Sequence, residues 1–306
     1  MRAAFSEALL ALAKSDPRVL LLTGDHGYAL FDGFRRECPR QYINAGIAEQ
    51  NMVGMAAGLA KAGFRPFVYG LSAFVPIRVL EQIKIDVAHD KLPVVFLGDG
   101  AGLVYSHLGT SHQSTEDIAC TRAIPHLAIY SPADRFEMKL CMQMAYDARG
   151  PVYLRMGKSD RGDVHQAPLT QANAGQWLAL KPGSAGGPAF VATGSMAVTA
   201  LRLAREAFPQ ASVWSAPCIK PAPVEQIATL CRESSCVVTL EEHSVIGGLG
   251  SLVSETACAM APARVLRIGV EDKFSEHCGT HAYLLKEHEI DDESIRRRLA
   301  ALLQGV

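Results

Sequence analysis

The side chain best suited to acid–base chemistry is Glu49, within residues 41–67, QYINAGIAEQNMVGMAAGLAKAGFRPF. This stretch predicts a strand end, a glycine turn and then a helix rich in small residues that ends at Gly63. Glu49 lies near the helix start, where the helix dipole tolerates a negative charge. Its apolar neighbours, including Ile47 and Met52, predict a partly buried carboxylate, which can share a proton. A first-turn Glu that only stabilises its helix is the alternative.

Asp99 is a second candidate, at the end of the apolar run VFLGDG (95–100). A strand followed by Gly-Asp-Gly can open a Mg²⁺ site if an Asn further along the chain supplies another ligand. The chain contains only Asn44, Asn51 and Asn173, and none lies at a suitable distance after Gly100. One carboxylate does not satisfy the near-octahedral demand of Mg²⁺. We therefore expect a strand-end turn at Asp99 and no metal ligands in this chain.

Composition narrows the class of protein. The 306 residues are enough for two domains, and 49% apolar with 20% charged residues is typical of a soluble globular chain. A net charge of −1 gives no electrostatic reason to expect nucleic acid or an anionic membrane as a partner. No signal peptide or transmembrane-length apolar run is recognised, and the eight cysteines are scattered. These features predict reduced thiols and a cytoplasmic protein.

The pattern of elements predicts an α/β fold with two doubly wound domains. In the first domain, 1–160, short apolar runs stopped by Gly, Asp or Pro predict strands at 19–25, 65–70, 93–99, 127–132 and 151–157. Helices are predicted at 2–14, 47–62, 76–89 and 134–147. This alternation favours a mostly parallel sheet covered on both faces.

A polar segment rich in Gly, Ala and Pro, 161–187, predicts a linker with a short hairpin around Trp177. The second, smaller α/β domain then covers 188–306. Its predicted strands are 189–194, 211–216, 236–242 and 264–270. Its predicted helices begin at Ser195 and cover 223–233, 249–261 and 291–304.

The segment NAGIAEQNMVGMAAGLA (44–60) resembles the pyrimidine-binding domain of transketolases and of 1-deoxyxylulose-5-phosphate synthases. Further pieces agree in order, and the last of them resembles the transketolase C-terminal domain: SAF (72–74), RVLEQIKIDVA (78–88), GTSHQSTEDIACTRAIPHLAIYSPAD (109–134), PVYLRMG (151–157) and LEEHSVIGGLGSLVSE (240–255). A full transketolase begins with a diphosphate-binding domain. This chain starts at the pyrimidine domain, so it resembles the second subunit of a split transketolase.

The resemblance implies a thiamine diphosphate site between this chain and an N-terminal-type transketolase subunit, which would supply the Mg²⁺ ligands. Glu49 would bond N1′ of the aminopyrimidine. Phe74 would stack on that ring, although a core Phe is the alternative. Ile47 and Arg78 would line the pocket; an ion pair of Arg78 with Glu81 on one helix face is the alternative.

The resemblance also implies substrate-binding residues. His112, in TSHQ, would act on the sugar's oxygens as a catalytic and binding group. Arg155, in YLRMG, would bind a sugar phosphate, with a solvated structural Arg as the alternative. His107 and His26 are further candidates for contact with the substrate.

Three departures from the family pattern suggest a changed acceptor. Gly100 and Leu108 stand where polar groups are expected, and GDHGYALF (24–31) lacks the Ser that helps hold phosphate in the family and offers His26 and Tyr28 instead. The function that we predict is the pyrimidine-binding subunit of a two-component transketolase, which moves a two-carbon ketol unit from a ketose or ketose phosphate to an aldose-type acceptor. It would form a homodimer core within a heterotetramer and be inactive alone. The alternatives are a 2-oxo-acid dehydrogenase β subunit, a 1-deoxyxylulose-5-phosphate synthase-like half and a non-catalytic partner subunit.

Overall fold

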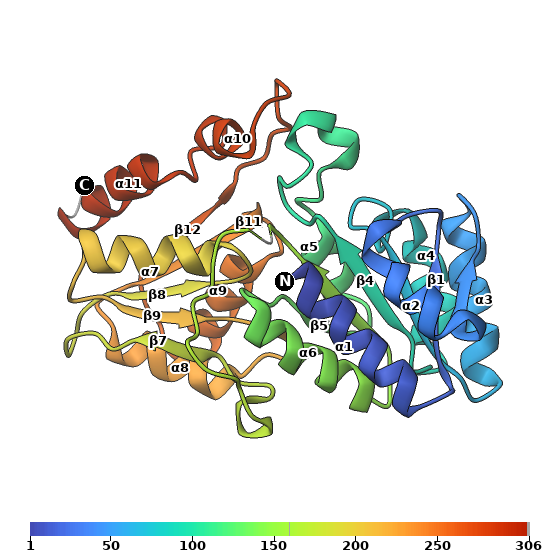
Figure 1. Cartoon of the computed structure of the whole chain (residues 1–306). Helices are drawn as coiled ribbons and strands as arrows, with labels where there is room; N and C mark the ends of the chain where they lie inside the picture. Colours follow the sequence, from blue (N-terminus) through green and yellow to red (C-terminus); the bar gives the residue numbers. More distant parts are fainter. Residues whose placement is uncertain (159, 305–306) are drawn as a thin grey trace.

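The chain folds into two sheet domains that lie side by side, as the computed structural model in Figure 1 shows for residues 1–158 and 160–304. The first domain is blue to green and the second yellow to red. Each contains a mostly parallel sheet with helices on its faces, so the predicted α/β class with two doubly wound domains is confirmed. Within the described ranges, no helix combines the length and apolar character needed to cross a bilayer.

The first sheet has seven strands in the order β10-β5-β6-β4-β3-β1-β2. The strands are β1 (Val19–Thr23), β2 (Tyr42–Asn44), β3 (Arg65–Leu71), β4 (Val95–Asp99), β5 (Ala128–Tyr130), β6 (Val152–Met156) and β10 (Cys218–Lys220). All pair in parallel except β10, which comes from the second half of the chain and runs antiparallel to β5. The five strands predicted in this half and the strand end predicted before Glu49, which is β2, are present, whereas β10 was not predicted.

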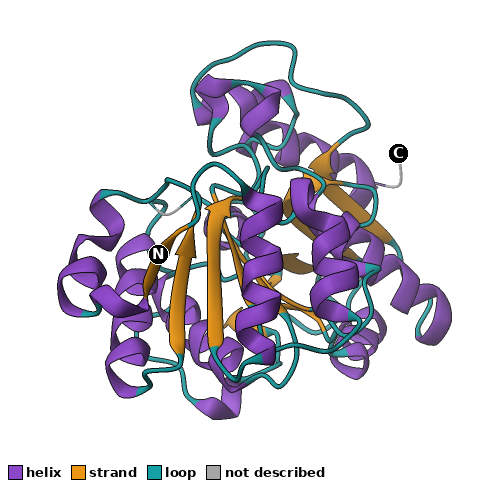
Figure 2. Cartoon of the chain, turned by 90° about the vertical axis from the view of Figure 1, so that its right-hand side faces the viewer, coloured by secondary structure: helices purple, strands orange, loops and turns teal. Residues whose placement is uncertain are grey.

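Helices cover both faces of this sheet (Figure 2). They are α1 (Arg2–Ser15), α2 (Asp32–Glu37), α3 (Glu49–Lys61), α4 (Leu80–Gln82), α5 (Asp117–Arg122) and α6 (Arg135–Asp147). Along β1, Val19 and Leu21 share a core with α1 and α6, whereas Leu20 and Leu22 share one with α3. Burial on both faces explains why the strands are continuous apolar runs. The helix predicted at 76–89 is a 3₁₀ turn, α4 and a π-helical turn, Ile83–Ala88.

The second sheet has five strands in the order β12-β11-β8-β9-β7, parallel except for β7. The strands are β7 (Leu178–Lys181), β8 (Ala189–Ala192), β9 (Ser212–Ser215), β11 (Val237–Ser244) and β12 (Val265–Val270). The helices are α7 (Met196–Glu206), α8 (Val224–Glu233), α9 (Leu249–Met260), α10 (His281–Glu287) and α11 (Asp292–Gln304). The hairpin predicted around Trp177 is wrong, because β7 pairs with the distant β9. Trp177 is buried and donates its ring N–H to the Cys218 carbonyl at 2.9 Å.

The two domains meet through buried polar groups at the end of β11. The Glu242 carboxylate accepts hydrogen bonds from Ser195 Oγ (2.6 Å), His281 Nε2 (3.0 Å) and the backbone N–H of Leu103 (3.3 Å). Leu103 belongs to the first domain, so the carboxylate bridges the interface. Burial alone would raise the pKa of Glu242, but the contacts with His281 and Ser195 lower it to about 2.

This lowered pKa predicts loss of stability in acid. A folded-state pKa below the ordinary 4.5 contributes stability that is present above pH 4.5 and is lost as the pH falls towards 2. Glu242→Gln should lower the free energy of unfolding at pH 7. Between pH 4.5 and 2, the free energy of unfolding of this variant should decrease by about 1–3 kcal/mol less than that of the wild type. Urea unfolding across this pH range measures the effect. Glu255→Gln, which alters a largely exposed carboxylate, is the control; equal slopes for wild type and Glu242→Gln would contradict the prediction.

Candidate active site

Glu49 lies at the first position of α3 and is 4% exposed. Its Oε2 atom accepts a hydrogen bond from Arg78 Nη1 at 3.0 Å. Its Oε1 atom is buried and has no hydrogen-bond partner. A buried acceptor without a partner is costly, so this oxygen is a natural place for a donor from a bound molecule.

Phe74 follows β3 and forms the aromatic centre of the site. The Arg78 guanidinium carbon lies 4.0 Å from the ring centroid. The His112 ring packs edge-on at 5.4 Å, and the His26 ring lies 6.4 Å away, measured between centroids. The structure therefore brings together five of the predicted residues: Glu49, Phe74, Arg78, His112 and His26.

The topology explains this grouping. The loops after β1, β3 and β4 carry His26, Phe74 and His112, the loop after β2 leads to Glu49 at the start of α3, and these four strands are parallel. Their carboxyl ends therefore lie at one edge of the sheet, where ligands of open α/β sheets bind. The predicted Ile47 and His107 lie in two of these loops, and both are exposed to solvent, Ile47 by 76%.

Arg78 does not form the ion pair with Glu81 that was the alternative for it. It pairs with Glu49 rather than with Glu81, and its planar guanidinium stacks on Phe74. The guanidinium is flat and carries N–H donors, and it contacts the Glu49 carboxylate and the Phe74 ring at the same time. The same two features suit a flat nitrogen heterocycle, with Glu49 at its edge and Phe74 against its face.

Arg155 is not part of this group, which corrects the predicted role in binding a sugar phosphate. It lies in β6 and is 2% exposed. Its Nε donates to Asp117 Oδ2 at 2.7 Å and its Nη2 to the Glu242 carbonyl at 2.8 Å. Both contacts are buried, so the guanidinium is already engaged within the protein. Burial alone would raise the pKa of Asp117, but the charge of Arg155 holds it below its usual range.

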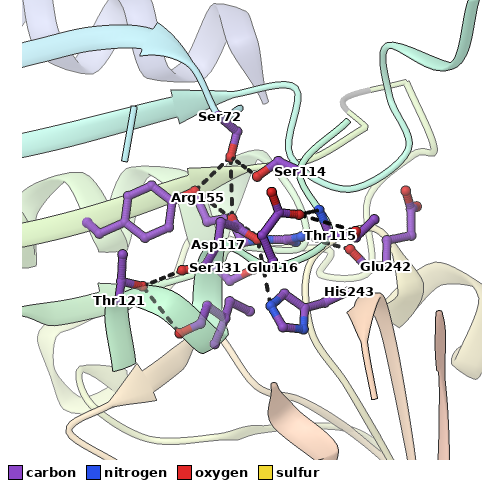
Figure 3. A network of polar contacts seen from close by, with 12 residues as sticks. Ser72, Ser114, Thr115, Glu116, Asp117, Thr121, Ser131, Arg155, Glu242 and His243 are labelled. Carbon is purple, nitrogen blue, oxygen red and sulfur yellow. Dashed lines mark hydrogen bonds and ion pairs between the residues drawn. The ribbon is translucent and has the colours of Figure 1, made fainter. Parts of the chain in front are cut away.

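Sequence reasoning missed the buried network around Asp117 (Figure 3). Tyr153 Oη donates to Asp117 Oδ2 at 2.6 Å, and Ser72 Oγ lies 2.8 Å from Tyr153 Oη. Ser72 also donates to Ser114 Oγ at 3.1 Å. The network joins β3, β6 and the start of α5, and no short motif in the sequence indicates such distant partners.

Asp99 is a structural residue in this chain. It is buried and accepts a hydrogen bond from Tyr69 Oη at 2.7 Å. Gly100 follows with φ +75°, and a Cβ there would lie 2.0 Å from the Tyr105 ring, so only glycine fits. Leu108, by contrast, is exposed. Among the described residues, no three His, Cys, Asp or Glu side chains come together as a possible metal site.

The fold defines a two-domain α/β protein, with a buried carboxylate and an aromatic ring near the carboxyl edge of its first sheet. Comparisons with known proteins give its family. Residues 1–162 match the model described as "Transketolase, pyrimidine binding domain" and residues 188–295 match "Transketolase, C-terminal domain". The chain belongs to the transketolase family and contains these two domains.

Three relatives show how far the likeness extends. The chain is 34% identical to an apulose-4-phosphate transketolase subunit of Phocaeicola vulgatus, with 96% of this chain and 94% of the relative covered. It is 32% identical to a 6-deoxy-6-sulfo-D-fructose transketolase subunit of Clostridium sp., with 97% and 92% covered. A solved structure, "Split gene transketolase, inactive beta4 tetramer", superposes with a TM-score of 0.85 at 32% identity, covering 97% of this chain and 95% of that one. These matches confirm the resemblance to a split transketolase subunit.

The burial of Arg155 predicts that its main effect is on stability. Arg155→Met should lower the free energy of unfolding by about 3–5 kcal/mol, because Asp117 would be left as a buried, uncompensated charge. Arg135→Met, which breaks an exposed pair with Asp163, is the matched control and should cost about 1 kcal/mol or less. Urea unfolding at neutral pH compares them. Equal, small losses in both variants would show that Arg155 is not a structural charge.

Proposed function

We propose that this chain is the pyrimidine-binding subunit of a two-component, thiamine-diphosphate-dependent transketolase. The single observation that supports it best is the buried Glu49 Oε1, which has no partner, while Arg78 binds the other oxygen of this carboxylate and stacks on Phe74. The carboxylate and the ring belong to a chain of the transketolase family, at the edge of the sheet where ligands bind.

The residues present fit the aminopyrimidine part of the cofactor. Glu49 Oε1 would hold the proton at N1′ of the pyrimidine, and Phe74 would support the ring face and fix its orientation. When bound, the cofactor supplies the electron sink for breaking and remaking a carbon–carbon bond. In the structure the Arg78 guanidinium stacks on Phe74, so it must move aside for the pyrimidine ring to stack on the same side of Phe74. Its side chain is long and 45% exposed, which allows that movement.

The proposed partner is an N-terminal-type subunit that carries the diphosphate and Mg²⁺ ligands. The described residues of this chain offer no acidic cluster for the metal. Two relatives of nearly the same length are named as transketolase subunits, and the split-gene relative was solved as an inactive tetramer of one kind of subunit. These names support the need for a second subunit here, in a heterotetramer with two copies of each chain.

The homodimer core of this assembly would use α3. A Cβ added at Gly54 or Gly58 would meet nothing within 4 Å, so the outer side of this helix is open along one stripe. Such a stripe permits close approach of a second helix. We propose the second copy of this chain as its neighbour.

The proposed substrates are a ketose donor with an anionic group and an aldose-type acceptor. Two relatives are named for a phosphorylated and a sulfonated sugar. In this chain, His112 and His26 flank Phe74 and would donate hydrogen bonds to sugar oxygens. Exposed His107 lies in the loop that leads to His112 and would border the entrance.

Glu49→Gln tests the proposed function. The amide keeps the shape of the side chain but cannot share a proton with N1′, so ketol transfer should fall by about 100-fold or more. The assay uses the chain co-purified with a diphosphate-domain subunit, thiamine diphosphate and Mg²⁺, with apulose 4-phosphate and 6-deoxy-6-sulfofructose as candidate donors.

The matched control is Glu7→Gln, an exposed carboxylate on α1 that should leave transfer unchanged. Full activity of Glu49→Gln in the same complex would refute the assigned role of the carboxylate. Transfer by this chain without any second subunit would refute the two-component assignment.

A further inference from the structure

Asp117 is a buried carboxylate that the proposed chemistry does not use. Its residue is 0% exposed. Its Oδ2 atom accepts hydrogen bonds from Tyr153 Oη (2.6 Å) and Arg155 Nε (2.7 Å), and Ser72 Oγ lies 3.4 Å from the same oxygen. Figure 3 shows Ser72 and Arg155 beside Asp117. Its Oδ1 atom has no hydrogen-bond partner. The orientation of the carboxylate is therefore fixed by contacts at one oxygen.

Two partners of this network connect directly to the candidate active site. Ser72 stands two residues before Phe74, and Ser114 two residues after His112. The two serine hydroxyls bond each other at 3.1 Å, and Tyr153 Oη lies 2.8 Å from Ser72 Oγ. The segments that carry Phe74 and His112 are thus joined by buried, directional bonds, while the two rings meet edge-on at 5.4 Å.

The second domain reaches the same network through the end of β11. The Glu242 carbonyl accepts from Arg155 Nη2 at 2.8 Å, and His243 Nε2 accepts from the backbone N–H of Ala119 at 3.2 Å. The N–H of Ser244 donates to the Thr115 carbonyl at 2.6 Å. His243 and Ser244 therefore hold the segment just before and within α5, on which Asp117 lies, while Glu242 holds Arg155, the charged partner of Asp117.

We propose that Asp117 is a positioning residue that aligns the Phe74 and His112 segments, and that the end of β11 sets its place. The C-terminal domain then shapes the candidate site without touching its aromatic centre. Directional bonds to a buried carboxylate specify one arrangement, whereas an apolar group of similar size would leave Ser72 and Tyr153 without this acceptor. The consequence for cofactor binding rests on the proposed function; the alignment itself does not.

The alignment can be measured in the free, full-length chain. Because Phe74 lies edge-on against His112, its ring current shifts the His112 ring protons in the NMR spectrum, and Phe74→Leu gives the position without that shift. Tyr153→Phe removes one hydroxyl that contacts both Asp117 and Ser72. The His112 signals should move towards the Phe74→Leu position while circular dichroism shows an unchanged fold. Tyr146→Phe, which removes a hydroxyl bonded to Asp16 at 2.9 Å, should leave them in place.

Two substitutions of His243 test the contribution of β11. His243→Leu removes the acceptor for Ala119 N–H and should shift the His112 signals, whereas His243→Gln offers an amide oxygen and should restore them.

In the complex with a diphosphate-domain subunit, Tyr153→Phe should weaken thiamine diphosphate binding by about threefold to tenfold. Unmoved His112 signals in both Tyr153→Phe and His243→Leu would overturn the inference. A shift of these signals supports it even if the wild-type complex binds no cofactor, an outcome that would refute only the proposed function.

Discussion

The buried pair of Asp117 and Arg155 is the interaction on which the rest of the structure depends. Arg155 binds Asp117 through Nε and the Glu242 carbonyl of the second domain through Nη2. Two charges removed from water are tolerable only when each is paired and hydrogen-bonded. Here the requirement is met by groups from β6, α5 and β11 together, so the two domains can pack only in an arrangement that satisfies them.

The residues of the candidate site lie at the carboxyl edge of the first sheet. Glu49 has one unpartnered oxygen, and the planar cation of Arg78 binds its other oxygen and stacks on Phe74. These features suit recognition of a flat heterocycle. Among the described residues, no three His, Cys, Asp or Glu side chains lie together as a possible metal site.

The sequence predicted which residues would lie near Glu49 better than it predicted the strand pairings and buried hydrogen bonds that hold them in place. Glu49, Phe74 and His112 follow strands that read as apolar runs, and parallel strands bring their carboxyl ends together. β10 was missed and β7 was given a local partner in place of β9, because strands of three or four residues that pair with distant partners leave no local pattern. Arg155 was misassigned because a motif does not show where a strand residue points. It alternates with Leu154 and Met156, and its face is buried against the second domain.

The central claim is that cofactor binding requires two different chains. Isothermal titration calorimetry of thiamine diphosphate with Mg²⁺ tests it most directly, first with this chain alone and then with this chain co-purified with a diphosphate-domain subunit. The account predicts saturable heat in the mixture and none for the chain alone. Tight, Mg²⁺-dependent binding by the chain alone would contradict it, and would mean that these 306 residues contain a complete cofactor site.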